Sequence, residues 1–352
     1  QNNGIRKILT FINVIFLHRM KDMKMSLGEN LIVTLFGESH GPAVGALIEG
    51  MPPNVEPDFD VLVADMISRR PGSGLASKRK ETDEVEFLAG IYDGKTTGMP
   101  ILLLIKNKDV RSKDYSFLPH QPRPGHADFP INVKTEGAAD LRGGGSFSAR
   151  LTAGLVAASS LTRTLIPEEW KIEATVGALG GMEGDEGRAL AEEARKSGDS
   201  LGSRVDLVIS GLPIGLGEPW FDGIEPALAR ALMAIPAARA VEFGRGVNAG
   251  LMRGSQHNDA YGNEMKLSEG ADGALGGMAS GAPIHVRVTF KPPSGISLPQ
   301  DTFNQTTGII EELAIKGRHD PVIAPRARPV VEAVARWVIA DLAIQGGYLD
   351  EN

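Results

Sequence analysis

Glycine and proline together account for 65 of the 352 residues (43 Gly and 22 Pro), and they follow no collagen-like period. Glycine weakens a helix and proline interrupts it, so such a chain cannot be built mainly from long helices. The remaining composition, with 42% hydrophobic and 23% charged residues, is ordinary for a globular protein and excludes a disordered or fibrous one. The sequence therefore predicts a globular fold of short elements joined by many turns and glycine-rich loops.

Apolar periodicity locates these short elements. Alternating or continuous apolar runs predict strands at residues 31–36, 43–49, 99–106, 203–209 and 283–291. Apolar spacings of three to four residues predict helices at residues 58–69, 148–165, 225–235 and 329–344. Asp58 is expected to cap the first helix, and Pro329 is expected to be the first residue of the last one. Residues 111–130 show no period and predict a long irregular segment, a feature that is uncommon unless it is functional.

The chain is expected to form one large domain, because no linker, low-complexity tract or change of composition divides it. Its first residues include an apolar run that is too short to span a membrane. The apolar run at residues 8–17 is shorter than the ~20 residues that a membrane span requires. No small-residue cleavage site of the kind that ends a signal peptide follows it. We expect residues 1–24 to be an extension outside the domain, which would span residues 25–352.

Charge and cysteine content exclude several classes of function. A net charge of −7 and a pI of about 5.6 argue against a general nucleic-acid-binding protein. No segment of the chain is long and apolar enough to predict a membrane protein. The absence of cysteine excludes disulfides, thiolate metal sites and cysteine nucleophiles. A cytoplasmic location is the simplest expectation for such a chain.

Four clusters place polar side chains among glycines and prolines, where core packing does not need them. They are FGESHG at 36–41, RPGHAD at 123–128, RGGGSFSAR at 142–150 and GRHDP at 317–321. The histidines of the first two, His40 and His126, can exchange protons near neutral pH. Three glycines ahead of a helix allow backbone amides to approach an anion. Each cluster taken singly also fits a structural turn or a surface ion pair.

Arginines gather in the irregular Gly/Pro motifs although the protein is acidic overall. The arginines concerned are Arg69, Arg70, Arg123, Arg142, Arg150 and Arg318. Arginine matches the geometry of carboxylates and phosphates, so together these residues predict a pocket for a small polyanion. A metal site is not expected, because the histidines and carboxylates show no HExxH or similar ligand spacing.

Taken in order along the chain, these motifs resemble those of the chorismate synthase family. The matching segments are FGESHGPAVG, SRRPG, ETDEVEFLAGIYDGKTTGMPI, RSKDY, RPGHAD, LRGGG…SAR, GLGEPWFD, VEFGRG, RGSQHND, GGMASG, FKPPSGIS and GRHDPVIAPRARPVVEA. One such motif is a weak signal, whereas a dozen in the same order are highly specific. The resemblance runs from about Met25 to the C-terminal helix and leaves residues 1–24 outside it.

The resemblance implies an α+β fold, namely a β-α-β sandwich with helices between two antiparallel sheets, assembled as a homotetramer (a dimer of dimers). It implies the family's reaction, which removes phosphate from 5-enolpyruvylshikimate 3-phosphate by anti 1,4-elimination and gives chorismate, in the shikimate pathway of aromatic amino acid biosynthesis. That reaction needs reduced FMN although it has no net redox change. We expect an external NAD(P)H-dependent reductant to supply the flavin, because no additional nicotinamide motif is present.

The family's site residues carry over by their position in the motifs. His40 and His126 match its two acid–base histidines, of which one protonates the leaving phosphate and the other serves the flavin; Asp320 matches its carboxylate near flavin N5. The substrate-binding positions are Arg69, Arg123, Ala149 and Arg150. The flavin-binding positions are Ser146, Phe147, Ser148, Pro236, Ala237, Gly276, Lys291, Pro292, Pro293, Ser294, Gly295 and Arg318.

The chain departs from the family pattern at a few positions near these motifs. Ser146, Phe147 and Leu151 stand where the family usually has Arg, Ser and Glu. Ser68 and Leu75 replace residues that are often basic. Two other functions remain as alternatives, a non-catalytic homologue that binds flavin or anions and a nicotinamide-linked oxidoreductase. The second is disfavoured because no GxGxxG fingerprint follows a strand.

Overall fold

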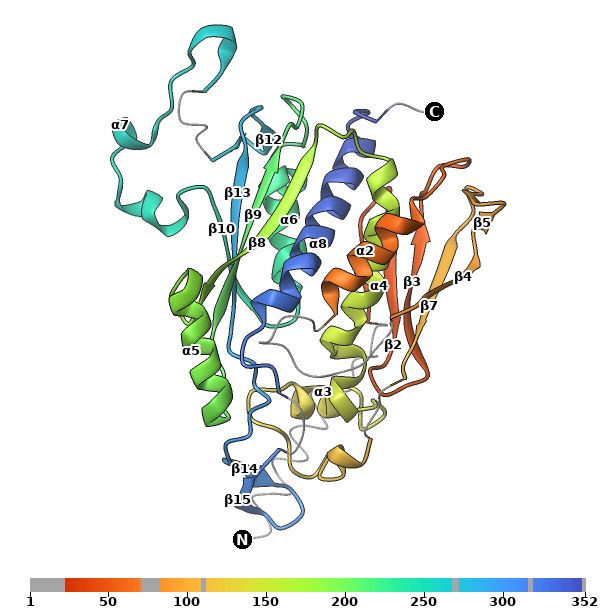
Figure 1. Cartoon of the computed structure of the whole chain (residues 1–352), viewed down its shortest axis with the longest axis vertical. Coiled ribbons are helices and arrows are strands. Elements are labelled where there is room, and N and C mark those ends of the chain that lie inside the picture. The colour runs from red at the N-terminus through yellow and green to blue at the C-terminus, as the bar shows by residue number, and fades with distance from the viewer. Residues whose placement is uncertain (1–22, 71–82, 109–111, 268–271, 316–318, 350–352) are drawn as a thin grey trace, which may run out of the picture.

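Two antiparallel sheets enclose a layer of helices in the computed structural model, which describes residues 23–70, 83–108, 112–267, 272–315 and 319–349 (Figure 1). The first sheet has the strand order β1-β2-β3-β7-β4, with β1 Ser26–Leu27, β2 Ile32–Gly37, β3 Ala43–Glu49, β7 Ile101–Lys106 and β4 Val85–Ala89. The second has the order β10-β13-β9-β8, with β10 Ala238–Phe243, β13 Ile284–Phe290, β9 Ser203–Ser210 and β8 Lys171–Leu179. The predicted β-α-β sandwich, a single α+β domain, is confirmed.

The five strands that the apolar pattern predicted form as β2, β3, β7, β9 and β13. In β13 the buried positions alternate with more exposed ones, since Ile284, Val286 and Val288 face the helices. In the first sheet, β2 and β3 form a hairpin whose register pairs Phe36 with Gly45 and Gly37 with Val44. This register leaves the GESHGP segment to turn between the strands, and it fixes the place of the first histidine cluster.

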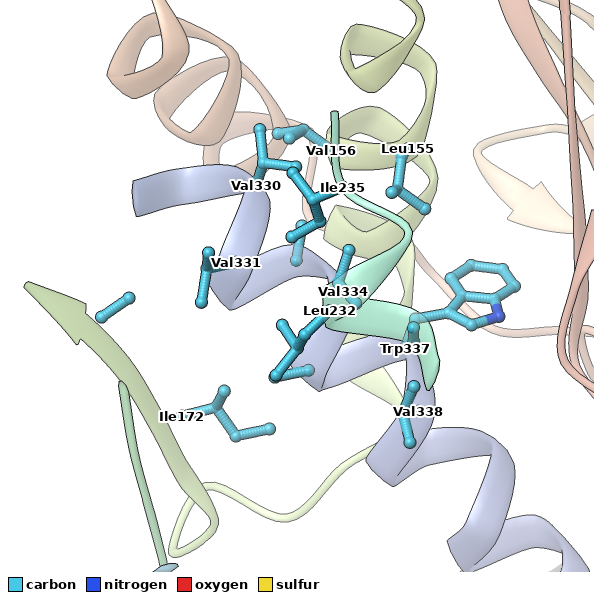
Figure 2. Close-up of a cluster of buried hydrophobic side chains, with 14 of the residues drawn as sticks. Leu155, Val156, Ile172, Leu232, Ile235, Val330, Val331, Val334, Trp337 and Val338 are labelled. Atoms are coloured by element: carbon cyan, nitrogen blue, oxygen red, sulfur yellow. The ribbon is translucent and has the colours of Figure 1, made fainter. Parts of the chain in front are cut away.

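Four helices fill the layer between the sheets: α2 Phe59–Arg69, α4 Thr152–Leu161, α6 Ile224–Met233 and α8 Ala324–Gln345. Helix α8 packs against the three other helices and against β8 and β9, while α4 packs against β3 and β7. All ten residues of α4 are buried, because the helix is covered on both sides. Figure 2 shows the resulting core, in which Val334 and Trp337 of α8 lie near Leu155 of α4 and Leu232 of α6.

The boundaries of two helices correct the sequence prediction. Helix α8 begins at Ala324, so Pro329 lies inside the helix and Pro325 occupies its first turn. A first-turn proline removes no helical hydrogen bond, whereas Pro329 removes one, and the burial of α8 offsets that loss. The helix predicted at 148–165 is split into a 3₁₀ turn at Ala149–Leu151, the shorter α4, and a 3₁₀ turn at Thr162–Thr164. Asp58 caps α2 as predicted, since its side chain accepts a hydrogen bond from the amide of Val61 at 2.9 Å.

The remaining elements lie around this sandwich. They are the helices α3 Asp128–Lys134, α5 Gly184–Ser197 and α7 Gly254–His257, and the short pairs β5 Ile91–Tyr92 with β6 Lys95–Thr96, β11 Ala274–Leu275 with β12 Met278–Ala279, and β14 Gln300–Asn304 with β15 Ile309–Leu313. Helix α3 lies beside one end of the helical layer (Figure 1) and closes the predicted irregular segment. Within the described ranges, no helix has the length and apolar content of a membrane span.

Candidate active site

A cavity of about 1000 Å³ opens at the end of the helical layer near α3. Its walls come from α3, the 143–151 segment, the C-terminal end of α6, the KPPSG segment after β13, and the start of α8. A smaller cavity of about 220 Å³ adjoins it, and the two share the walls formed by Ser148, Ala149, Pro236, Ala237 and Asp320. The fold thus brings segments from the whole length of the chain to one place.

Most of the site residues predicted from the sequence line these two cavities. The large cavity is lined by Arg123, His126, Ser146, Phe147, Ser148, Ala149, Pro236, Ala237, Lys291, Pro292, Pro293, Ser294, Gly295 and Asp320. The small cavity adds Arg69 and Arg150. His40 and Gly276 line neither cavity, and Arg318 lies outside the described residues.

The glycine cluster forms a left-handed turn at the cavity wall. Gly143, Gly144 and Gly145 have φ angles of 59°, 87° and 53°, which only glycine adopts readily. A side chain at 145 would also collide with the carbonyl oxygen of Asp140, 1.9 Å from its Cβ. Within the turn the amide of Gly144 donates to the carbonyl of Leu141, and the carbonyl of Gly145 accepts a hydrogen bond from the amide of Ser39. The turn places Phe147, an exposed aromatic side chain, in the cavity wall.

His40 lies behind this glycine turn. A Cβ on Gly143 would lie 2.7 Å from Cδ2 of the His40 ring, so the missing side chain is what lets the imidazole approach the cavity wall. The His40 ring also meets the Tyr115 ring edge to face, with 4.9 Å between ring centroids. The histidine turn itself is held by Asn107, whose side-chain amide donates to the carbonyls of Glu38 and Gly41 at 2.9 Å.

His126 is neutral at pH 7 in this environment. Burial, followed by the nearby charge of Arg123, lowers the pKa of its imidazole from 6.5 to about 4. Its Nδ1 lies 3.1 Å from the carbonyl oxygen of Pro124. Because a carbonyl can only accept, Nδ1 carries the proton, and Nε2 is left with the lone pair. The ring is therefore a base before any anion binds.

The predicted substrate arginines are buried in ion pairs with aspartates. Arg123 binds Asp128 through two bonds, Nε–Oδ2 at 2.8 Å and Nη2–Oδ1 at 2.7 Å, and its guanidinium lies 5.2 Å from the centroid of the Tyr115 ring. Arg69 and Arg150 share Asp83. Both aspartates lie within the matching motifs, but the sequence gives no reason to single them out, because a carboxylate is not expected to bind an anion.

Other cations in the cavity were also missed. Among the described residues, the cations lining the large cavity are Lys24, Arg123, Arg230, Arg239, Lys291 and Arg326, and the carboxylates are Asp128 and Asp320. Arg326 bonds Asp320 at 2.8 Å and holds that carboxylate at the wall. Arg239 and Arg230 carried no sequence signal, because each lies in a strand or helix pattern that an exposed arginine satisfies.

Gly276 is separated from the cavity by the length of α6. It lies in the β11–β12 turn, where the neighbouring Gly277 accepts a hydrogen bond from the amide of Ile224 at 2.8 Å. Ile224 begins α6, whereas the cavity is lined by residues at the opposite end of that helix. Ten helical residues span about 15 Å, so within one chain Gly276 does not join the other predicted flavin positions.

The chain is similar to known proteins over nearly all of its length. A family model described as chorismate synthase matches residues 31–344. A chorismate synthase of Aeropyrum pernix is 44% identical over 351 residues, which cover 91% of this chain and 92% of that relative. Another, from Thermococcus kodakarensis, is 42% identical and covers 89% of this chain and 96% of its own. A crystal structure of chorismate synthase has a TM-score of 0.69 at 26% identity, covering 91% of this chain and 93% of that one.

Proposed function

Because this chain belongs to the chorismate synthase family, we propose that its two adjoining cavities form the active site of that family's reaction. The protein is a carbon–oxygen lyase that removes phosphate from 5-enolpyruvylshikimate 3-phosphate and forms chorismate. A non-catalytic homologue is not favoured, since the similarity extends to relatives named for the enzyme.

The excess of cations in the cavity is the observation that carries this proposal. Six cationic side chains against two carboxylates suit a substrate that bears two carboxylates and a phosphate. A volume of about 1000 Å³ is at the upper end of the range for small-molecule sites and has room for a flavin beside the substrate. The composition and size of the cavity therefore fit two anionic ligands together.

Two adjacent cations fit the phosphate of a bound FMN. Burial, and after it the charge of Arg239, lowers the pKa of Lys291. The hydrogen bonds of Lys291 go to the carbonyl of Gly125 and the hydroxyl of Ser294, and that of Arg239 goes to the carbonyl of Ala238. No carboxylate of the described residues pairs with either cation. Two like charges held together in this way favour an anion between them, and the KPPSG segment would hold that end of the flavin.

The chain's own residues bind, orient and transfer protons. Lys291, Arg239 and the KPPSG segment would hold reduced FMN, which would supply the transient electron donation that assists phosphate departure. His126 presents an unprotonated Nε2 at pH 7, so it becomes an acid only when a dianionic phosphate nearby raises its pKa. Asp320 is held at the cavity wall by Arg326, where it would serve the flavin. His40 would act from behind Gly143.

Further properties follow from the family and complete the proposal. An external NAD(P)H-dependent reductant supplies the reduced flavin, and the protein works in the cytoplasm as a homotetramer. Residues 25–352 form the catalytic domain, and residues 1–24 lie outside it. The flavin contacts predicted for Gly276 and Arg318 remain part of this proposal.

Anaerobic flavin titration followed by turnover tests the function. We expect reduced FMN to bind more tightly than oxidised FMN, and substrate to tighten the binding of either, because the substrate completes the flavin site. Chorismate should then form with pre-reduced FMN. Equal affinity for both redox states, no effect of substrate and no turnover would refute the lyase assignment.

Steady-state kinetics test the roles of the histidines. His126→Ala and His40→Ala should each lower kcat by ~10²–10⁴-fold with little change in KM, because a general acid acts in the transition state. Arg150→Ala should raise KM as well, since it is expected to bind an anion in the ground state. If both histidine variants keep near-normal kcat while KM rises, the histidines position anions and transfer no proton.

A further inference from the structure

Asp83 lies at the wall of the small cavity with its carboxylate between two arginines. Its Oδ2 accepts a hydrogen bond from Nη1 of Arg69 at 3.1 Å, and its Oδ1 accepts one from Nη1 of Arg150. Only 2% of the Asp83 side chain is exposed, compared with 5% for Arg69 and 6% for Arg150. The three side chains therefore form one buried charged cluster.

The two guanidiniums are fixed by more than this carboxylate. Arg69 also donates to the hydroxyl of Thr152 and to the carbonyl of Ala149, at 3.2 and 3.1 Å. Arg150 donates through Nε to the side-chain oxygen of Asn107 at 2.9 Å. Because these contacts come from α4, the preceding turn and the end of β7, the arginines keep their places when the charge of Asp83 is removed.

The three side chains, two guanidiniums and one carboxylate, together carry a net positive charge. All three side chains line the small cavity, which joins the large one at Ser148 and Ala149. An anion entering there meets two arginines whose charge is already partly neutralised by a neighbouring carboxylate.

We propose that Asp83 is the resident counter-ion of the substrate's anion site. Before substrate binds, Asp83 neutralises one arginine charge. After the reaction, it lowers the affinity of both arginines for the released phosphate. This inference rests on the proposed assignment of Arg69 and Arg150 to the substrate. Asp83 is a positioning residue, because it acts on the ligand through the two arginines.

The size of the effect follows from electrostatics. A carboxylate one guanidinium away from a bound phosphate, on the order of 7 Å from it, weakens phosphate binding by about tenfold or more at the effective dielectric constant of proteins. Asp83→Asn removes the charge and keeps the shape. Asn also tolerates the left-handed backbone of this position, where φ is 47°.

Asp65 offers a matched control. Its carboxylate likewise lies between two arginines, with Oδ1 at 2.9 Å from Nη2 of Arg163 and Oδ2 at 3.7 Å from Nη1 of Arg336. It belongs to α2 and lines neither cavity. Asp65→Asn therefore reproduces the loss of a shared carboxylate without touching the proposed anion site.

Calorimetric titration of the full chain with inorganic phosphate tests the inference. We expect Asp83→Asn to bind phosphate at least about tenfold more tightly than the wild type, with stronger product inhibition by phosphate and a lower kcat. Asp65→Asn and the charge-preserving Asp83→Glu should bind phosphate as the wild type does. Unchanged or weaker phosphate binding in Asp83→Asn, or equally tightened binding in Asp83→Glu, would overturn the inference.

The stability of Asp83→Asn gives a second measurement. If phosphate replaces the missing carboxylate, millimolar phosphate should raise the Tm of Asp83→Asn more than that of the wild type or of Asp65→Asn. A variant that phosphate fails to stabilise, or that stays unfolded in its presence, contradicts the inference. Phosphate binding is measured without turnover, so it tests the role of Asp83 alone. The lyase assay tests the proposed function separately.

Discussion

The ionisation of His126 gives a stability difference that can be calculated and measured. Its pKa is lowered from 6.5 to about 4 in the folded protein, while the unfolded chain titrates near the ordinary value. Between those values the unfolded state binds a proton that the folded state does not. The contribution of His126 to the free energy of unfolding is therefore fully present above pH 6.5 and is lost as the pH falls toward 4. Between pH 7 and pH 4 this one group should remove about 3 kcal/mol from the free energy of unfolding.

Urea unfolding of the wild type and of His126→Gln at pH 7 and pH 4 measures this quantity. Between pH 7 and pH 4 the free energy of unfolding of the wild type should fall by about 3 kcal/mol more than that of His126→Gln, because glutamine does not titrate. His285→Gln is the matched control, since it removes an exposed histidine of β13 that lines neither cavity. Its stability should depend on pH as that of the wild type does.

Titration of the His126 ring protons by NMR supplies the independent check. We expect a midpoint near pH 4 without ligand. Inorganic phosphate should move that midpoint upward, because a nearby anion favours the charged imidazolium. The reasoning would be refuted if the wild type and His126→Gln lost equal stability between pH 7 and pH 4, or if the midpoint lay near 6.5. His126 would then titrate as an ordinary exposed histidine does.

Three further changes test the structure around the cavity. Asp341→Asn should lower the free energy of unfolding by about 2–3 kcal/mol in urea, because this buried carboxylate accepts three backbone amides after β1 at 2.8–2.9 Å; a loss under 0.5 kcal/mol would contradict that. Gly145→Ala should lower Tm by more than Gly181→Ala, since both have positive φ but only position 145 has a carbonyl oxygen against the new Cβ; equal losses would show that strain alone acts. Asp128→Asn should lower the NMR midpoint of His126 further, because the Asp128 charge raises that pKa, and an upward shift would refute this pairing.

Local sequence patterns were enough to predict much of the sandwich. Alternation of apolar residues identified β13, and a capping aspartate identified the start of α2. The strand β8 and the helix α5 were missed, because β8 has exposed polar residues on one face and α5 buries only Gly187, Ala191 and Ala194. A helix that buries only small residues leaves a weak apolar signal.

The motif residues of the site were likewise predictable, but their partners were not. His126 and Arg123 stand in one short motif, and their place at the cavity follows from it. The sharing of Asp83 by Arg69 and Arg150 joins three segments of the chain. No spacing in the sequence encodes a contact of that kind, because it depends on how α2 and the turn before α4 pack against the first sheet.

The family, many of the elements and the residue types that gather at the site could be predicted from the sequence alone, because periodicity and motifs are local properties of the chain. Which charges meet depends on the tertiary structure. Burial made His126 neutral, paired three predicted anion-binding arginines with aspartates, and left Lys291 beside Arg239. The physical reason is that ionisation and charge pairing depend on desolvation and on distances of a few ångströms, which are set by segments remote in the sequence.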